Sequence, residues 1–351
     1  MSLTVRVLEA GHGDCILISH HDGACAYNVL IDGGTLTTFY INPQKRIPGQ
    51  LKIALDGIIQ AGEFIDLLIL THIDNDHIAG LIKAFQVEGY LSKLTKKLWF
   101  NSSRSITDYF LANAIPENDL AIESPDVATS AKQGNTFEEL IASLDIWDRQ
   151  IIQAGERRVE GPCVFQILSP TEEDLRKLLC IWPKEETSTY TAGKRRYTYA
   201  PLEDILLNDK FVPEDSITNK SSIAFILTID QQLFLFLGDA AEYAITESLE
   251  ALGYSEDKPL ALQLFKVSHH GSKKNTSNEL LKLVTCENFV ISTNGDNHGH
   301  PDREVLAKIL LANDNNKIFF NYRHRLTEAF SKEELHTYGD RIQAKNTWNF
   351  K

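Results

Sequence analysis

The sequence lacks the features that mark several broad classes of protein. No apolar run approaches the roughly 20 residues that a membrane-spanning helix needs. The first residues show no charged leader followed by an apolar stretch, so we expect no secretory signal and no membrane partner. The five cysteines form no C-x-x-C pair, which argues against a thiolate zinc site. Their odd number favours a reducing compartment, and we predict a cytoplasmic protein.

Positive charge is also scarce. The chain has 35 Lys and Arg against 48 Asp and Glu, which gives a formal net charge of −13. This balance argues against extensive electrostatic binding of nucleic acid, because such binding needs Lys and Arg. It does not exclude a phosphate substrate, since a bound dication can supply positive charge locally.

Short apolar runs rich in β-formers alternate with helical patterns along the chain. Several of the runs are continuous, as in strands that are buried on both faces. The predicted strands cover residues 5–8, 15–18, 29–31, 67–70, 164–168, 223–229, 233–237, 264–267, 289–291 and 318–320. The predicted helices cover residues 51–60, 78–86, 137–147, 172–179, 241–252, 278–284 and 302–312. We therefore expect sheets covered by helices.

No linker divides this pattern, so we predict a single domain over residues 1–351. Residues 184–220 break the rhythm with polar, aromatic and basic side chains, and we interpret them as an insertion loop within the domain. Such a loop is either a solvated surface segment or a substrate-side loop whose Arg and Tyr side chains meet phosphates or bases.

The most informative segment is residues 67–81, with the sequence LLILTHIDNDHIAGL. His72, Asp74, Asp76 and His77 follow directly after an apolar strand and precede a helix, and such a loop can hold converging metal ligands on a rigid base. The alternative is a capping turn, in which Asp74 or Asn75 caps the helix. A cap accounts for one acidic residue but not for two His and two Asp, so the pattern favours a metal site.

Further polar residues occur just past other apolar strands, where loops of a sheet commonly carry functional groups. For any one of them, a hydrogen-bonded structural role is the plainer interpretation. Together with the 72–77 cluster, metal ligation becomes the better one. These residues are Asp32, Asp239, His269, His270, His298 and His300.

The segment THIDNDHIAG resembles the H-x-[HD]-x-D-H motif of the metallo-β-lactamase superfamily. Five further segments resemble, in the same order, motifs of the hydrolase domain of the bacterial competence protein for DNA uptake. These segments are VRVLEAGHGDCILI, VLIDGG, FLFLGDA, LFKVSHHGS and NHGHPDREVL. The resemblance runs from about residue 4 to about residue 310. It implies an α/β fold of the αββα type, a four-layer sandwich of two mixed sheets with helices on both outer faces.

The resemblance also implies a set of metal ligands. His72 and Asp74 would serve one metal position, Asp76 and His77 with His269 or His270 the other, and Asp239 would bridge both. Asp32 would orient the ligand loop. This chain has Asp74 where the commoner pattern has His, and it has no His between His77 and His269. We expect one or two divalent ions, Zn or Mn, with the carboxylates shifting the preference toward Mn.

The implied chemistry is hydrolysis by a metal-activated water. Asp76 or Asp239 would orient the water or accept its proton, and His300 would stabilise charge on the substrate oxygens. We expect His270, His300, Ser272 and Asn297 to bind the substrate. For Ser272 and Asn297, turn chemistry beside a glycine is an equal alternative.

The predicted function is a phosphodiesterase or nuclease that acts on DNA or another nucleotide. One alternative is a metallo-hydrolase of an ester, thioester or lactone. Another is a non-catalytic metal-binding or regulatory protein with the same fold, since fold does not determine function. The competence protein carries this domain beside membrane helices, and the present sequence has no such helices. We therefore expect the chain to stand alone or to work with a separate protein partner in a multi-component system.

Overall fold

The computed structural model describes residues 1–110, 125–182, 199–296 and 299–351. The chain divides into two compact units, and each unit contains one large sheet. Unit 1 comprises Met1–Gln153, Pro170–Thr191 and Thr347–Lys351, and unit 2 comprises Ala154–Ser169 and Ala192–Asn346. Of the helices in the described parts of the chain, none combines the length and the apolar character needed to span a bilayer.

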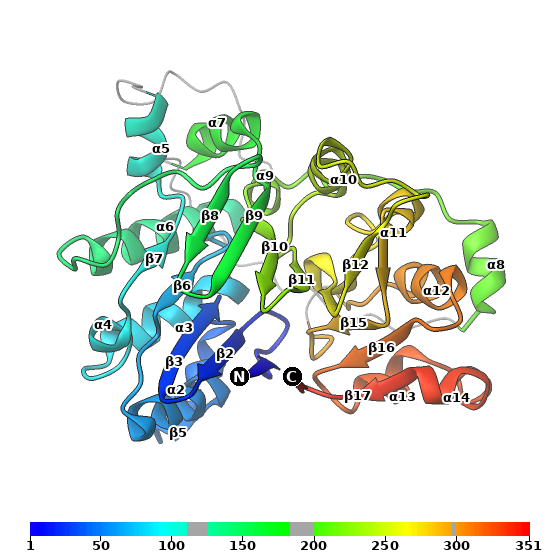
Figure 1. The fold of residues 1–351 in the computed structure, drawn as a ribbon, viewed down its shortest axis with the longest axis horizontal. Helices are drawn as coiled ribbons and strands as arrows, with labels where there is room; N and C mark the ends of the chain where they lie inside the picture. The colour runs from blue at the N-terminus through cyan, green and yellow to red at the C-terminus, as the bar shows by residue number, and fades with distance from the viewer. Residues whose placement is uncertain (111–124, 183–198, 297–298) are drawn as a thin grey trace. The chain divides into compact units, whose positions relative to one another are not determined.

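The sheet of unit 1 has six strands in the order β18-β1-β2-β3-β6-β7. An antiparallel meander of β1, β2 and β3 continues through parallel pairing of β3 with β6 and of β6 with β7 (Figure 1). The C-terminal β18 pairs antiparallel with β1. The bounds of the strands are β1 Ser2–Val7, β2 Ile16–Asp22, β3 Cys25–Ile31, β6 Leu67–Ile69, β7 Leu98–Trp99 and β18 Thr347–Phe350.

The helices of unit 1 present apolar faces to its core. In α3, the buried positions include Ile78, Leu81, Ala84 and Phe85, which recur at helical spacing. The helices are α1 Leu36–Phe39, α2 Gln50–Ala61, α3 Asn75–Gln86, α4 Leu91–Leu94, α5 Ser103–Phe110, α6 Pro125–Ile141 and α7 Glu172–Ile181. A small hairpin joins β4 Tyr40–Asn42 to β5 Ile47–Pro48.

The sheet of unit 2 has eight strands in the order β17-β16-β15-β13-β11-β10-β9-β8. Strands β8 to β11 pair antiparallel, whereas β11, β13, β15, β16 and β17 pair parallel. The strands are β8 Arg157–Glu160, β9 Cys163–Ser169, β10 Ala224–Ile229, β11 Gln232–Phe236, β13 Leu264–Lys266, β15 Asn288–Ile291, β16 Lys317–Phe320 and β17 Ile342–Ala344. A separate parallel pair consists of β12 Leu260–Leu262 and β14 Val284–Cys286.

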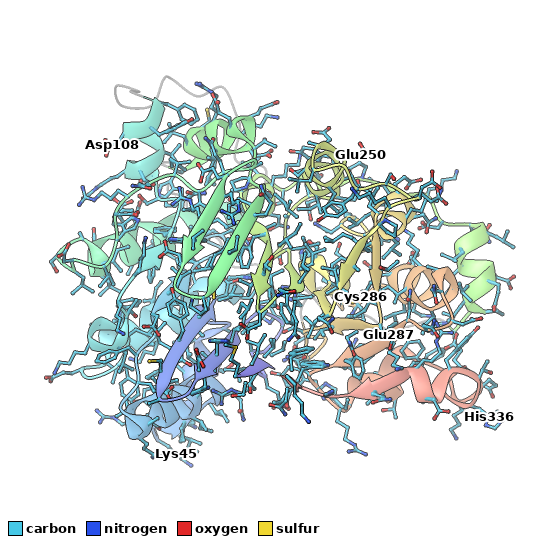
Figure 2. All side chains as sticks on the ribbon, in the orientation of Figure 1. Lys45, Asp108, Glu250, Cys286, Glu287 and His336 are labelled. Atoms are coloured by element: carbon cyan, nitrogen blue, oxygen red, sulfur yellow. The ribbon has the colours of Figure 1, made fainter. Side chains whose placement is uncertain are left out.

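The core of unit 2 contains many buried aromatic rings on its strands. Phe165, Phe225 and Phe236 form a run of ring contacts across β9, β10 and β11. Charged side chains lie on the surface, for example Glu250 and Glu287 of this unit (Figure 2). The helices are α8 Leu202–Leu207, α9 Ile217–Lys220, α10 Glu242–Ala251, α11 Asn278–Lys282, α12 Arg303–Ala312, α13 Arg325–Ala329 and α14 Lys332–Tyr338, with 3-10 turns η1 Ser268–Gly271 and η2 Gly339–Arg341.

Two mixed sheets with helices between and around their strands confirm the predicted α/β class. The carboxyl ends of parallel strands meet at one edge of a sheet, which is where α/β proteins carry their functional loops. In unit 1 this edge follows β3 and β6, and in unit 2 it follows β11, β13 and β15. The predicted insertion at 184–220 is described only over residues 199–220, which contain α8 and α9, and its role stays a prediction.

Candidate metal centre

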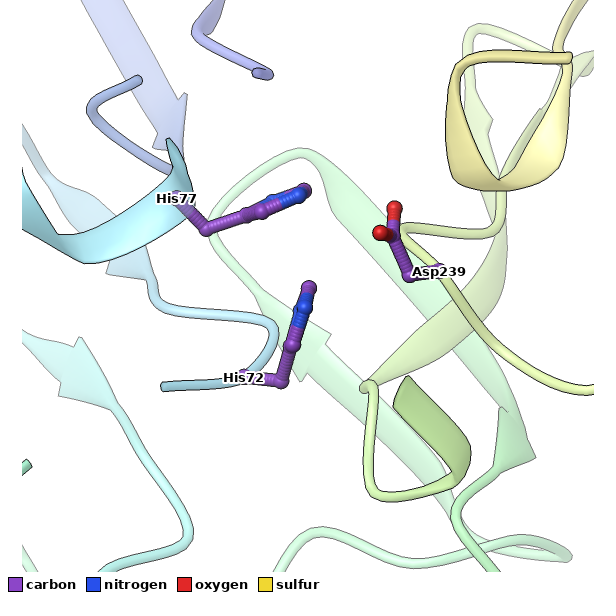
Figure 3. Close-up of side chains that lie close together, drawn as sticks. All are labelled: His72, His77 and Asp239. Carbon is purple, nitrogen blue, oxygen red and sulfur yellow. The ribbon is translucent and has the colours of Figure 1, made fainter. Parts of the chain in front are cut away.

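The ligand loop of unit 1 leaves β6 at Ile69 and enters α3 at Asn75. His72 lies in the loop and His77 in the first turn of the helix, and both side chains are fully buried. Their ring centroids are 4.2 Å apart, and the outer edges of the two rings approach each other (Figure 3). The fold of this loop therefore brings together two imidazoles that are five positions apart in the sequence.

Asp32 holds His77 in a defined orientation. Its carboxylate, which is buried directly after β3, accepts hydrogen bonds from the Thr71 backbone N–H at 2.8 Å and the Thr71 hydroxyl at 2.7 Å. The same carboxylate lies 2.8 Å from His77 Nδ1. A carboxylate accepts from Nδ1–H, so Nε2 is the nitrogen that this arrangement offers to a metal ion. Asp32 has a φ of +56°, a strained conformation that clusters at functional sites.

Asp74 occupies the N-cap position of α3, but within the described chain its side chain makes no capping hydrogen bond. Its Oδ1 instead accepts a hydrogen bond of 2.7 Å from the Ser130 hydroxyl, and its Oδ2 lies 3.7 Å from His72 Nε2. The capping interpretation of this residue is therefore wrong, and Asp74 faces His72. Asp76 lies in the first helical turn, where a carboxylate interacts favourably with the helix dipole.

The loop at 10–14 packs directly on the start of α3. The Asp14 N–H donates to the Asp76 carbonyl at 3.3 Å, and a Cβ added at Gly13 would lie 1.7 Å from that same oxygen. Only glycine permits this approach. Asp14, Asp32 and His77 are all buried, and each offers a potential ligand atom within 4.8 Å of the others. Asp14 was missed by sequence reasoning, although it ends the GHGD motif.

In unit 2, Asp239 follows β11 and is labelled in Figure 3. His269 and His270 follow β13 in the tight turn η1, where both residues have positive φ values of 47° and 54°. Two consecutive non-glycine residues in this region are strained, which is common at functional sites. The turn directs His269 Nε2 to 3.6 Å from Asp239 Oδ2 and His270 Nε2 to 3.7 Å from Asp239 Oδ1.

Each of these two imidazoles is oriented through its other nitrogen. His270 Nδ1 lies 2.9 Å from the Ser292 carbonyl oxygen, to which it donates, and His269 Nδ1 lies 2.9 Å from Glu214 Oε2. Sequence reasoning missed Glu214, because nothing in its polar segment distinguishes it from a surface residue. Both Nε2 atoms are thereby directed toward the Asp239 carboxylate.

His269 and Glu214 shift each other's pKa in the direction that favours the charged form of both. Burial by itself lowers the pKa of His269, but the Asp239 charge and the hydrogen bond to Glu214 raise it above its ordinary value. Burial by itself raises the pKa of Glu214, but the hydrogen bond and the charge of His269 lower it to about 2. A divalent cation on His269 Nε2 would replace a proton there, as metal binding to histidine generally does.

His300 also lies in this group, with its ring centroid 5.2 Å from that of His269. Burial lowers the pKa of His300 to about 4, against the opposing influence of Asp302, whose Oδ2 is 3.5 Å from His300 Nδ1. The Ser272 hydroxyl accepts a hydrogen bond from the Lys274 N–H, which is the turn chemistry given as its alternative role. Asn297 and His298 lie outside the described residues.

The donor set of each unit fits a divalent cation. Two ligand atoms on one tetrahedral zinc are about 3.3 Å apart, given metal–ligand bonds of about 2.0–2.1 Å. The 3.6 and 3.7 Å separations around Asp239, and the 3.7 Å between His72 and Asp74, are close to that spacing and too long for strong hydrogen bonds. Mixed imidazole and carboxylate ligands suit Zn and Mn alike.

No protein-family model matches the chain. The curated ComE operon protein 3 of Bacillus subtilis (strain 168) is 23% identical to it over 340 residues, which cover 92% of this chain and 33% of that protein. The chain therefore spans only a third of the length of this curated relative.

Solved structures that the chain is similar to include the metallo-β-lactamase fold protein YhfI from Bacillus subtilis, with 12% identity, 99% of each chain covered and a TM-score of 0.36. They also include Zn(2+)-bound PqqB from Methylobacterium extorquens, with 12% identity, 100% of each chain covered and a TM-score of 0.43. As the motifs predicted, the chain is similar to a ComE operon protein and to a metallo-β-lactamase fold protein.

Proposed function

We propose that the chain is a metal-dependent hydrolase that cleaves phosphodiesters of DNA or another nucleotide. The observation that carries the proposal is the buried Asp32 carboxylate, which fixes His77 with Nε2 outward beside His72. A carboxylate that orients a histidine in this way is the usual support of a metal ligand. In unit 2, the carboxylate of Asp239 and the imidazoles of His269 and His270 would supply further ligands of the same kinds.

A divalent cation, when bound, supplies Lewis-acid activation of water and of the scissile group. The chain's own residues orient the reacting groups and accept or donate protons. Asp76 and Asp239 are the carboxylates that would accept the proton of the attacking water. Because its pKa is lowered to about 4, His300 is neutral at pH 7, so it would stabilise substrate oxygens as a hydrogen-bond donor and not as a cation.

The phosphodiester substrate is supported by the motifs that resemble those of the DNA-uptake protein. The net charge of −13 does not exclude it, because a bound dication would supply positive charge locally. The same centre could instead hydrolyse an ester, thioester or lactone. A protein partner and a cytoplasmic location belong to the same proposal, the latter in accord with five free cysteines.

The test combines metal analysis with hydrolysis. The purified chain is stripped with EDTA and reloaded with Mn²⁺ or Zn²⁺, and bound metal is counted by mass spectrometry. Cleavage of single-stranded DNA, double-stranded DNA and bis-p-nitrophenyl phosphate is then measured, with lactone and thioester substrates in parallel. Asp76→Ala is compared with Asp314→Ala, whose side chain is fully exposed.

We expect one or two equivalents of metal, metal-dependent phosphodiester cleavage, and a rate loss of about 100-fold or more in Asp76→Ala only. A folded wild-type chain that binds no metal would show a non-catalytic protein of the same fold. Cleavage of the lactone or thioester alone would retain the hydrolase and replace the substrate.

A further inference from the structure

Glu214 is a buried carboxylate in the described part of the 184–220 segment and lies outside the motifs that carry the predicted ligands. Its exposed fraction is 4%, and it lies just before the short helix α9. Oε1 accepts hydrogen bonds of 2.9 Å from the backbone N–H groups of Asp215 and Ser216. Oε2 accepts one of 3.1 Å from Asn219 Nδ2 and lies 2.9 Å from His269 Nδ1.

The partners of His269 Nδ1 determine where the ring carries its proton. Asn275 Oδ1 lies 3.1 Å from Nδ1, and the amide is oriented because Asn275 Nδ2 donates to the carbonyl oxygens of Asp239 and Ala240. Asn219 Nδ2 also lies 3.4 Å from Nδ1, but it donates to Glu214 Oε2 at the shorter distance of 3.1 Å. The two nearer partners of Nδ1, a carboxylate and an amide oxygen, are both acceptors, so Nδ1 is the donor. Nε2 is then the nitrogen directed at the Asp239 carboxylate, 3.6 Å away.

The segment around Glu214 is anchored to the histidine turn through its backbone as well. The Glu214 N–H donates to the Lys274 carbonyl at 3.2 Å, and the side chain of Lys274 forms an ion pair with Asp215. Besides the contact with His269, three hydrogen bonds hold the carboxylate of Glu214 itself. The backbone hydrogen bond of Glu214 and the ion pair of Asp215 hold the chain on which it stands. A rigid support of this kind is what precise orientation of a ligand requires.

We propose that Glu214 is a positioning residue of the metal centre, which fixes the His269 tautomer and directs Nε2 toward the cation shared with Asp239. This inference rests on the proposed function, because it presupposes a cation there. It assigns a purpose to part of the 184–220 segment: this segment delivers a carboxylate that the motifs themselves do not contain.

Glu214→Gln tests the proposal with little change of shape. Because Oε1 accepts from two backbone N–H groups, the amide oxygen of the glutamine must take that place, and its NH₂ group must face His269 Nδ1. Nδ1 would then have to accept, and the proton would move to Nε2, where it blocks metal binding. We expect Co²⁺ and Mn²⁺ affinity to fall about 10- to 100-fold.

The measurements are Co²⁺ titration, followed by the visible absorption of the bound ion, and Mn²⁺ binding by calorimetry. Glu334→Gln is the matched control, since Glu334 is a mostly buried glutamate of the same unit that pairs with Arg303 and caps α14. In a His269→Ala background, we expect Glu214→Gln to change the affinity by less than about two-fold, because its effect acts through the missing ring.

The outcomes separate the two proposals. Wild-type chain that binds no Co²⁺ or Mn²⁺ overturns both. If the wild type binds metal and Glu214→Gln has the same affinity and spectrum, the role of Glu214 is overturned and the hydrolase proposal stands. The same conclusion follows if the effects of Glu214→Gln and His269→Ala on the affinity add. Should Glu214→Gln not fold, nitrogen-15 spectra of histidine-labelled, Zn²⁺-loaded wild type decide: Nδ1–H on His269 supports the proposal, and Nε2–H overturns it.

Discussion

Substituting Asp32 by asparagine tests the support of His77 with the least disturbance. The backbone of Asp32 has a φ of +56°, a left-handed conformation that asparagine tolerates better than most residues. The amide oxygen can still accept from the Thr71 N–H in place of Oδ1. The NH₂ group takes the place of Oδ2, facing the Thr71 hydroxyl and His77 Nδ1.

The hydroxyl can turn to accept, but the imidazole can do so only by moving its proton to Nε2. Loss of this charge-assisted hydrogen bond should lower the free energy of unfolding of the metal-free protein by about 1.5–3 kcal/mol. Metal affinity should fall about 10- to 100-fold, as for other substitutions that remove the orienting partner of a ligand.

Urea denaturation with EDTA, and again with Mn²⁺ at 100 times the wild-type Kd, measures both effects. At that concentration the metal stabilises the wild type by about 2.7 kcal/mol. The stabilisation should fall to about 1.4 kcal/mol for a 10-fold weaker site and to about 0.4 kcal/mol for a 100-fold weaker one. Asp66→Asn is the control, because Asp66 accepts from the Asn28 N–H and Lys96 before β6, away from the ligand loop.

Asp66→Asn should therefore lower the stability of the metal-free protein but leave the metal-induced increment at about 2.7 kcal/mol. If Asp32→Asn kept the full increment, the orientation of His77 by Asp32 would not matter for metal binding, and the reasoning from this pair would be refuted.

Three further predictions concern the metal-free protein and its response to metal. Because the pKa of His300 is lowered to about 4, the unfolded chain binds more protons than the folded one between pH about 6.5 and 4. The free energy of unfolding should therefore decrease as the pH is lowered through this range, by up to about 1.4 kcal/mol per pH unit. His300→Gln should flatten this slope in denaturation curves of the EDTA-treated protein. Gly13→Ala should lower Tm and metal affinity, because its Cβ would meet the Asp76 carbonyl. Gly57→Ala, on an open face of α2, should instead raise the free energy of unfolding by about 0.5–1 kcal/mol. Equal effects of the two substitutions would contradict the packing of the 10–14 loop on α3. Because the pKa of His269 is raised, metal binding should release protons. Calorimetry in buffers of different ionisation enthalpy measures the number of protons released. If no protons were released, ligation by His269 would be contradicted.

The sequence was most informative where strands end in ligand-type residues. The apolar run at 67–70 and the polar residues after it predicted a loop that enters a helix, and His72 and His77 do come together there. The helix begins at Asn75, before the expected start near residue 78, which places Asp76 and His77 in its first turn. Local patterns sufficed here because β6, the loop and α3 are contiguous.

Other features depended on contacts between distant segments. A helix was predicted at 137–147, but α6 ends at Ile141, and the following residues turn so that Trp147 pairs with Leu98 of β7. Tertiary pairing outweighed the apolar periodicity. Asp14 and Glu214 were missed because their partners, His77 and His269, are more than fifty residues away, and no local spacing indicates them.

The most direct test of the account is diffraction from crystals grown with Mn²⁺ or Zn²⁺, using the anomalous signal of the metal. We expect an anomalous peak within about 2.0–2.2 Å of His77 Nε2 and a peak at the same distance from an Asp239 carboxylate oxygen. A map without metal at His77 Nε2 or at Asp239 would contradict the proposed ligands.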